Sequence, residues 1–146
     1  MQGETGMQHI AKVSVDELPV TTEFLREKRL IEERGELALI SDGKIFRHLA
    51  YFSLKAGKGF YRGGHYHLKK VEHIYVISGE LKIRFVDLDT GDEYIGRFRD
   101  GHRITIYPRC AHLFTAEKDA HVIEYYESPY DPDDYITFDG FVESGF

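Results

Sequence analysis

The sequence is poor in the features that would place it in a membrane or in an oxidising compartment. It has one cysteine and no tryptophan in 146 residues, and its apolar runs all stay short of the roughly 18 residues that a membrane span requires. The first six residues are polar, so we expect neither a signal peptide nor a membrane partner. Because Cys110 has no internal disulfide partner, we expect a reducing, cytoplasmic setting, with this thiol as a small buried residue.

Charge of either sign is also never concentrated. The formal net charge is −6, and acidic and basic residues are interspersed without a Lys/Arg block long enough to follow a phosphate backbone. Nucleic acid is therefore not an expected partner. With 42% hydrophobic and 30% charged residues, the composition is that of a single globular domain with one core.

The sequence does contain a histidine pair followed by a carboxylate. His65 and His67 are two residues apart, and on an extended strand such residues point to the same face, whereas Tyr66 points away. Glu72 stands at the head of a β-branched and aromatic run, residues 73–78, that predicts a strand. Imidazole and carboxylate groups together suit a divalent transition metal such as Zn, Fe, Mn or Ni. We therefore predict a metal site that includes these three side chains.

The spacing of this segment resembles the first motif of the cupin superfamily, which runs Gly, five residues, His-x-His, three or four residues, Glu, six residues, Gly. The matching positions are Gly59, His65, His67, Glu72 and Gly79. The resemblance implies a cupin β-barrel with the metal ligands at its cavity. It also implies a fourth ligand, a histidine in a second motif further along the chain.

A later segment is similar to that second cupin motif, which runs Gly, five residues, Pro-x-Gly, two residues, His, three residues, Asn. Gly101 and His112 stand at the required separation, so the resemblance supplies His112 as the fourth metal ligand. The interior departs from the family, with Tyr107, Arg109 and Ala116 in the places of proline, glycine and asparagine. These changes keep the ligand but put the geometry of the local turn in question. The alternative is a cupin pocket that keeps its histidines without a metal.

Two residues just before the histidine pair are candidates for substrate binding. Tyr61 shares the strand parity of His65 and His67, which predicts that it lines the same cavity mouth. Arg62 carries a planar cation suited to phosphate or carboxylate, although an arginine at the start of a strand usually only faces solvent. We expect both to contact a small, oxygen-rich ligand.

A narrower resemblance points to carbohydrate. Residues 62–67, Arg-Gly-Gly-His-Tyr-His, look like the Arg-Gly-x-His-x-His segment of the dTDP-sugar 3,4-ketoisomerases, and residues 127–136 are similar to the acidic Tyr-Asp-x-x-Asp-Tyr-Ile tail of that group. The resemblance implies that the histidines carry protons and that the arginine reaches the substrate. Glu72 departs from the group, which typically has glutamine there and binds no catalytic metal. The resemblance therefore implies carbohydrate chemistry more than that particular reaction.

Turn signals recur along the chain from Gly35 onward, with no helical pattern between them. They include Ser78-Gly79-Glu80 and two signals that predict tight hairpin turns, Asp42-Gly43 and Asp89-Thr90-Gly91-Asp92. This rhythm predicts an all-β fold, an antiparallel jelly-roll β-barrel.

The N-terminal segment is expected to be a short arm with one of two local structures. A helix over residues 22–33, preceded by a capping box at Ser14 and Glu17, competes with a strand over Leu30–Glu32. The predicted division is an arm over 1–34, a barrel over 35–128, and an acidic and aromatic tail over 129–146.

Three functions fit these residues. The leading one is an isomerase or epimerase of a small sugar, sugar acid or nucleotide-sugar, in which the metal polarises a carbonyl or hydroxyl and a base moves the adjacent proton. Tyr61, Glu72 and a hydroxide at the metal are all open candidates for that base. An Fe(II)-dependent dioxygenase would use the same ligands, and a non-catalytic cupin would use the pocket only to bind. Ten tyrosines and ten phenylalanines exceed what one small barrel readily buries, so we expect a homodimer.

Overall fold

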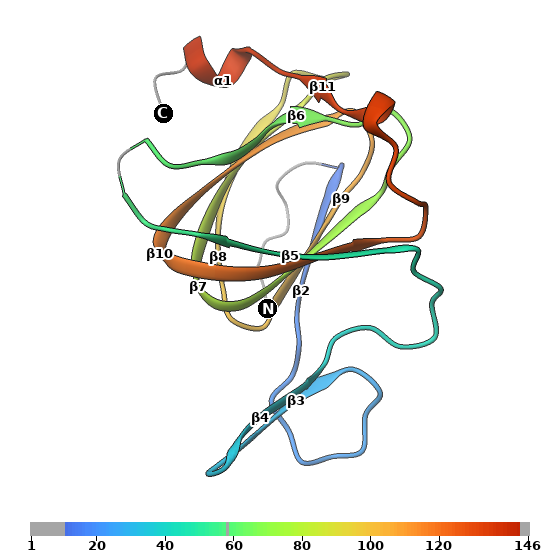
Figure 1. Cartoon of the computed structure of the whole chain (residues 1–146), viewed down its shortest axis with the longest axis vertical. Helices are drawn as coiled ribbons and strands as arrows, with labels where there is room; N and C mark the ends of the chain where they lie inside the picture. Colours follow the sequence, from blue (N-terminus) through green and yellow to red (C-terminus); the bar gives the residue numbers. More distant parts are fainter. Residues whose placement is uncertain (1–10, 58, 144–146) are drawn as a thin grey trace.

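The computed structural model describes residues 11–57 and 59–143, which are built mainly of antiparallel strands (Figure 1). The longer strands are β2 (Val13–Glu17), β3 (Lys28–Glu32), β4 (Gly35–Leu39), β5 (His48–Leu54), β6 (Arg62–Tyr66), β7 (Glu72–Asp87), β8 (Glu93–Arg99), β9 (His102–Ile106) and β10 (Cys110–Tyr126). The tail adds the 3₁₀ turn η1 (Pro132–Asp134), the short strand β11 (Ile136–Thr137) and the short helix α1 (Gly140–Glu143). The prediction of an all-β jelly roll is confirmed.

Two sheets face each other, and β7 and β10 belong to both. Residues 72–75 of β7 pair with β9, whereas residues 80–86 pair with β8. Likewise, residues 112–114 of β10 pair with β6, and residues 120–126 pair with β5. The two long strands also pair with each other. Both therefore bend from one sheet into the other and close the barrel (Figure 1).

The bend in β7 lies at Gly79, where the sequence pattern predicts a turn. The predicted turn is wrong, because the chain does not reverse here and β7 continues through Gly79. Gly79 has a φ of +91°, and a Cβ at this position would lie 2.1 Å from the carbonyl oxygen of Asp119 on β10. A glycine is required because the two backbones approach too closely for any side chain.

Apolar side chains fill much of the space between the sheets. Along β7 the inward positions are Ile74 and Val76 before the bend, and Leu81, Ile83 and Phe85 after it, so the inward parity changes at the bend. The buried residues of this cluster are Val13, Leu54, Ile74, Val76, Leu81, Ile83, Phe85, Phe98, Ile104, Ile106, Cys110, Phe114, Ala120 and Val122.

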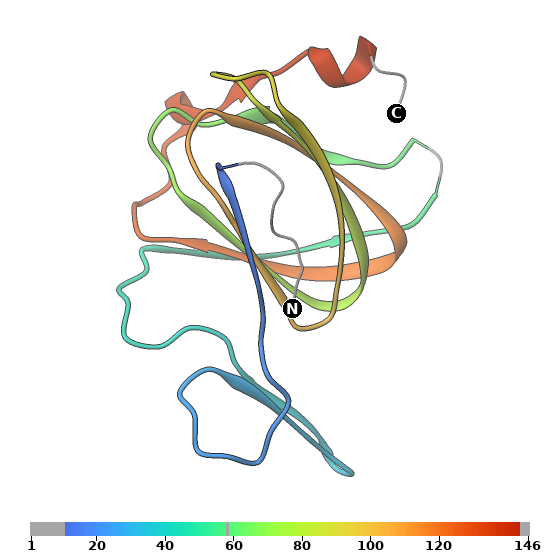
Figure 2. The same cartoon turned by 180° about the vertical axis from the view of Figure 1, so that it is seen from behind.

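Strands β3 and β4 form a separate hairpin that projects from one end of the barrel (Figure 2). The predicted helix over residues 22–33 is therefore wrong, and the competing strand over Leu30–Glu32 is confirmed. Arg29 gives the physical reason. Its guanidinium is buried against Glu36 on β4, at 2.6 Å, and Asp100 in the β8–β9 turn, at 2.9 Å. The pair with Glu36 joins β3 to β4 and the pair with Asp100 joins the hairpin to the barrel, and both favour an extended segment over the local helix propensity.

Two smaller expectations near the N-terminus are also wrong. Ser14 and Glu17 do not cap a helix, because both lie on β2, which pairs with β9. Asp42 and Gly43 do not close a hairpin, because β4 pairs with β3 while β5 pairs with β10.

The division at residues 34 and 128 stays a prediction, although β2 pairs with the barrel strand β9 and β11 with the barrel strand β6. The polar start of the chain falls within residues 1–10, outside the described residues. Across 11–57 and 59–143, no helix has the length and apolarity needed to cross a membrane.

Candidate metal centre

Three histidines converge between the two sheets. His65 on β6 pairs directly with His112 on β10, and His67 is the residue after the end of β6. Each histidine offers one ring nitrogen, and these three nitrogens all lie within 4.8 Å of one another. The ring centroids are 4.9 to 5.3 Å apart. This triad has the spacing to bind one metal ion.

Glu72 approaches the same cluster from the opposite sheet. It is the first residue of β7, and its Oε1 lies 3.2 Å from Nε2 of His112 and 3.7 Å from Nε2 of His67. All three of these side chains are buried. The structure therefore groups the three histidines and places Glu72 against two of them, His112 and His67.

The hydrogen bonds of the histidines show which nitrogens face the centre. Nδ1 of His67 lies 2.7 Å from the carbonyl oxygen of Asp134, and Nδ1 of His112 lies 3.0 Å from that of Cys110. A carbonyl can only accept, so each Nδ1 carries a proton, and Nε2 is the nitrogen of each ring that faces the centre and is available to a cation. Both Nε2 atoms and Glu72 Oε1 are buried without a hydrogen-bond partner among the described residues. Three lone pairs that face one another fit a bound cation.

The electrostatics of the cluster agree with this donor set. Burial, together with the neighbouring histidines, lowers the pKa of His65 to about 3, so its ring is neutral at pH 7. Burial of Glu72 would by itself raise its pKa, and the Lys70 ammonium, 3.8 Å from Oε2, acts in the opposite direction. The cluster therefore offers imidazole nitrogens, with the ring of His65 neutral, and a carboxyl group beside a cation.

The C-terminal tail fixes the loop that carries His67, a role that the sequence pattern does not reveal. The carboxylate of Asp134 accepts the backbone N–H groups of residues 68–70, at 2.7, 3.2 and 3.0 Å, while its own carbonyl accepts from His67. Directly after it, β11 pairs with Tyr66 and His65 on β6. The acidic, proline-containing tail carries a local turn signal, but nothing in it identifies the loop that it holds.

Lys70 and Tyr135 are further members of the cluster that sequence reasoning misses. Lys70 Nζ donates to the Tyr135 hydroxyl at 2.5 Å and lies 3.8 Å from Glu72 Oε2. The same nitrogen lies 4.1 and 4.2 Å from the ring centroids of Tyr126 and Tyr135. Burial lowers the pKa of Lys70, with Glu72 acting in the opposite direction. A lysine beside Lys69 on a loop has the sequence pattern of a solvent-facing residue.

The turn before His112 keeps the geometry that its altered motif put in question. Arg109, in the motif's glycine place, has a φ of +64°, the left-handed conformation that glycine adopts easily. Its N–H donates to the carbonyl of His67 at 2.7 Å, and its guanidinium pairs with Asp89 at 2.7 Å. The backbone therefore follows the motif although the residue does not.

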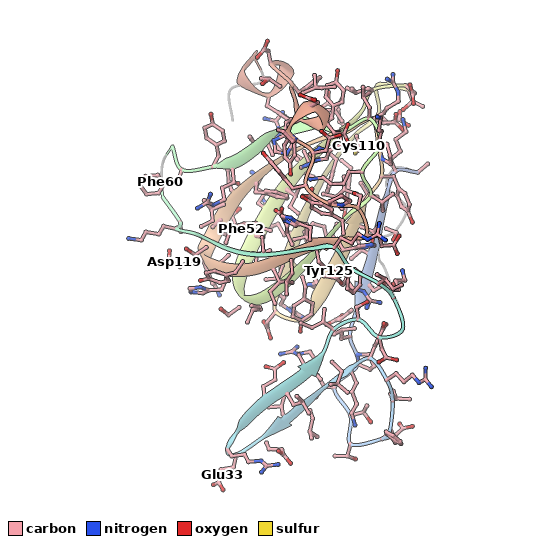
Figure 3. The ribbon with its side chains drawn as sticks, turned by 45° about the vertical axis from the view of Figure 1, so that its right-hand side comes forward. Glu33, Phe52, Phe60, Cys110, Asp119 and Tyr125 are labelled. Atoms are coloured by element: carbon pink, nitrogen blue, oxygen red, sulfur yellow. The ribbon has the colours of Figure 1, made fainter. Side chains whose placement is uncertain are left out.

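Cys110 lies at the boundary between the cluster and the apolar core. It is 1% exposed, and burial raises the pKa of its thiol to about 12. The prediction of a small buried thiol is confirmed, and the position of Cys110 on the chain is marked in Figure 3.

Tyr61 and Arg62 lie beside the cluster, on a hollow of about 460 Å³ between β5 and β6. Arg62 donates from Nε to the carbonyl of Ser53 at 3.0 Å, and its guanidinium carbon lies 5.5 Å from the ring centroid of Phe52. Phe60 lies on the connecting loop at the rim of the barrel (Figure 3). Among the described residues, the predicted metal ligands do not line this hollow.

Comparisons with known proteins give a family and a fold. A family model described as the polysaccharide biosynthesis C-terminal domain matches residues 31–138. No curated protein matches the chain significantly.

Solved structures of sugar-nucleotide enzymes resemble the chain. The 3,4-ketoisomerase QdtA from Thermoanaerobacterium thermosaccharolyticum, in complex with TDP-4-keto-6-deoxyglucose, has a TM-score of 0.72 at 21% identity, covering 90% of this chain and 91% of that one. The TDP-quinovose 3,4-ketoisomerase WlaRB from Campylobacter jejuni has a TM-score of 0.69 at 17% identity, covering 92% and 99%. The RmlC epimerase from Mycobacterium tuberculosis has a TM-score of 0.69 at 16% identity, covering 90% and 70%. At these identities the likeness shows a shared cupin fold.

Proposed function

The chain belongs to the family of polysaccharide biosynthesis C-terminal domains, and we propose that it is a metal-dependent isomerase or epimerase of a nucleotide-linked sugar or a related small sugar. The observation that carries the proposal is the set of buried acceptors, His67 Nε2, His112 Nε2 and Glu72 Oε1, without a donor among the described residues. We assign His65 as the fourth ligand. Three imidazoles and one carboxylate suit Zn, Fe, Mn or Ni.

The chemistry follows from the chain's own groups around this point. When bound, the metal would supply Lewis-acid polarisation of a sugar carbonyl or hydroxyl, which acidifies the neighbouring C–H group. The substrate would approach past His65, which is partly exposed, whereas His67 and His112 are buried. The ring of Tyr135, with its centroid 5.1 Å from that of His65, covers one side and limits the entry of water.

A metal-free ketoisomerase is the second candidate, favoured by one observation. Burial keeps His65 neutral at pH 7, so its imidazole has a lone pair that can accept a proton from a carbon next to a carbonyl. The solved relatives named as 3,4-ketoisomerases motivate this reading. Glu72 counts against it, because a buried carboxylate facing bare imidazole nitrogens needs a cation or a proton.

Metal content of the purified protein, measured by elemental mass spectrometry, tests the proposal. We expect about one Zn, Fe, Mn or Ni per chain, lost in His67→Ala and kept in His121→Ala, a matched change at an exposed histidine of β10. Absence of metal, with no uptake of any of these ions, would overturn the metal site and leave proton transfer by His65. Iron together with chelator-sensitive oxygen consumption would identify a dioxygenase instead.

We assign substrate binding to Tyr61 and Arg62. Both are exposed, and Arg62 has a cationic fork beside an open hollow, the arrangement that suits a phosphate group. TDP and TDP-sugars are suitable ligands for calorimetry, since QdtA is described in complex with them. We expect Arg62→Met to weaken nucleotide binding by about tenfold, while a substitution of the hairpin residue Arg34, which is exposed on the turn between β3 and β4, leaves it unchanged.

We also propose that the chain is a homodimer. The projecting hairpin exposes Ile31 and Leu37, the preceding loop exposes Phe24, and β5 exposes Leu49 and Tyr51. These exposed apolar side chains are available for contact with a second copy of the chain. Light scattering that reports a monomer at micromolar concentration would refute the dimer without affecting the metal site.

A further inference from the structure

Lys70 is a buried cation beside a candidate metal ligand, and the proposed function gives it no task. Its side chain is 5% exposed, and its Nζ lies 3.8 Å from Glu72 Oε2. An ammonium with so little access to water is costly unless specific partners hold it. The contacts of the Lys70 ammonium therefore indicate its role.

The two oxygens of Glu72 face different neighbours. Oε1 lies 3.2 Å from His112 Nε2 and 3.7 Å from His67 Nε2, whereas Oε2 faces Lys70. A carboxylate can bind a cation through one oxygen or through both. An oxygen that already faces an ammonium is less available to a metal ion, because the two cations repel each other.

The ammonium of Lys70 is itself held in place. It donates to the Tyr135 hydroxyl at 2.5 Å and lies close to the ring faces of Tyr126 and Tyr135, where the cation–π attraction is favourable. Its backbone N–H is bound by Asp134 at 3.0 Å. The tail thus fixes both ends of Lys70, and Nζ remains beside Glu72.

We propose that Lys70 is a positioning residue that restricts Glu72 to one-oxygen coordination of the metal and moderates the attraction of the site for divalent cations. The inference rests on the metal site of the proposed function. With Oε2 directed at Lys70, only Oε1 is presented to the ion. A carboxylate that uses one oxygen leaves a coordination position free for an oxygen of the substrate.

Cobalt(II) is a suitable probe, because its visible absorption weakens as its coordination number rises. We expect Lys70→Met to bind Co²⁺ about tenfold more tightly than the unmodified protein, since a repelling charge is removed, and to absorb more weakly, since Glu72 then binds through both oxygens. Lys69→Met is the matched control, because Lys69 is exposed on the same loop. We expect it to retain both the affinity and the spectrum. Tyr135→Phe, which removes the hydroxyl that orients Nζ, should shift both in the direction of Lys70→Met by a smaller amount.

The outcomes separate this inference from the proposed function. Failure of the unmodified protein to bind Co²⁺ would overturn the metal site, and the role of Lys70 with it. Binding by the unmodified protein, with Lys70→Met equal to Lys69→Met in affinity and spectrum, would overturn the role of Lys70 alone. A loss of affinity in Lys70→Met would also overturn it. If Lys70→Met does not fold, as judged by thermal unfolding, Tyr135→Phe decides by the same two measurements.

Discussion

The two ends of the barrel interior are built by the same strands and filled with opposite chemistry. Along β7, Glu72 and Ile74 are consecutive inward-facing residues, so the interior changes from charged to apolar within two positions. Along β10, His112 stands next to the inward-facing Phe114. Close packing of side chains is sufficient to stabilise the apolar end. The polar end presents buried acceptors that need a cation.

This difference shows which parts of the chain each end depends on. The apolar end is held by strand residues alone. The polar end needs support from outside the strands, because Asp134 and Tyr135 of the tail hold the loop and the lysine around the ligands. Stability and site geometry are therefore expected to respond to different substitutions.

Leu81→Ala should have the largest effect on stability and none on the site. Leu81 is fully buried, so the loss of its side chain and the remaining cavity should lower the free energy of unfolding by about 3 kcal/mol. Urea unfolding measures this loss, and Co²⁺ titration of the folded variant should give an unchanged affinity. A parallel loss of affinity would contradict the independence of the two ends.

Asp134→Ala should have a smaller effect on stability and a large effect on the site. Three backbone N–H groups lose their acceptor, which should cost about 2 kcal/mol after the loop relaxes. Because the loop carries His67, the affinity for Co²⁺ should fall by about 10- to 100-fold. An unchanged affinity would show that the tail does not support the metal centre.

The stability contribution of Asp134 should also depend on pH. Burial alone would raise its pKa, but the N–H groups of residues 68–70 outweigh it and hold the pKa below the ordinary value of 3.8. A carboxyl with a lower pKa in the folded state stabilises the protein above its unfolded pKa, and this contribution is lost as the pH falls through the folded pKa. The difference in unfolding free energy between the unmodified protein and Asp134→Ala should be full at pH 6 and shrink below about pH 4. Urea unfolding at a series of pH values, without metal, measures it.

Arg109→Gly should have the smallest effect, and in the stabilising direction. Relief of the left-handed conformation should contribute about 1 kcal/mol, partly offset by loss of the exposed ion pair with Asp89. Thermal unfolding should show an unchanged or slightly raised midpoint. A destabilisation above 1 kcal/mol would show that the arginine side chain, rather than the backbone, determines this turn.

The part of the site that could be predicted lies in local spacing. The period of a strand places His65 and His67 on one face, and the motif spacing identifies Glu72 and His112. Lys70 and Asp134 could not be found in this way. The ammonium of Lys70 contacts Tyr135, which lies 65 positions further along the chain, and Asp134 accepts the backbone N–H of Lys70 from 64 positions away. No local sequence pattern encodes contacts between residues so far apart in the chain.

The same distinction explains the errors in the fold. The turn signal at residues 89–92 correctly marks the reversal between β7 and β8, but a glycine signal does not tell a chain reversal from a bend, as at Gly79. The residues over 22–33 have helix propensity, and the ion pairs of the buried Arg29 side chain with Glu36 and Asp100 outweigh it.

The passage of β7 and β10 through both sheets has a kinetic consequence. Closing the barrel requires His48 to pair with Tyr126 and Val13 to pair with Ile106, and folds dominated by such distant pairings typically form in milliseconds to seconds. The sheets share two continuous strands, so they cannot separate as rigid halves. We therefore expect Glu72 of one sheet and His112 of the other to keep their separation until global unfolding, so that an ion enters and leaves past the partly exposed His65 rather than by parting of the sheets.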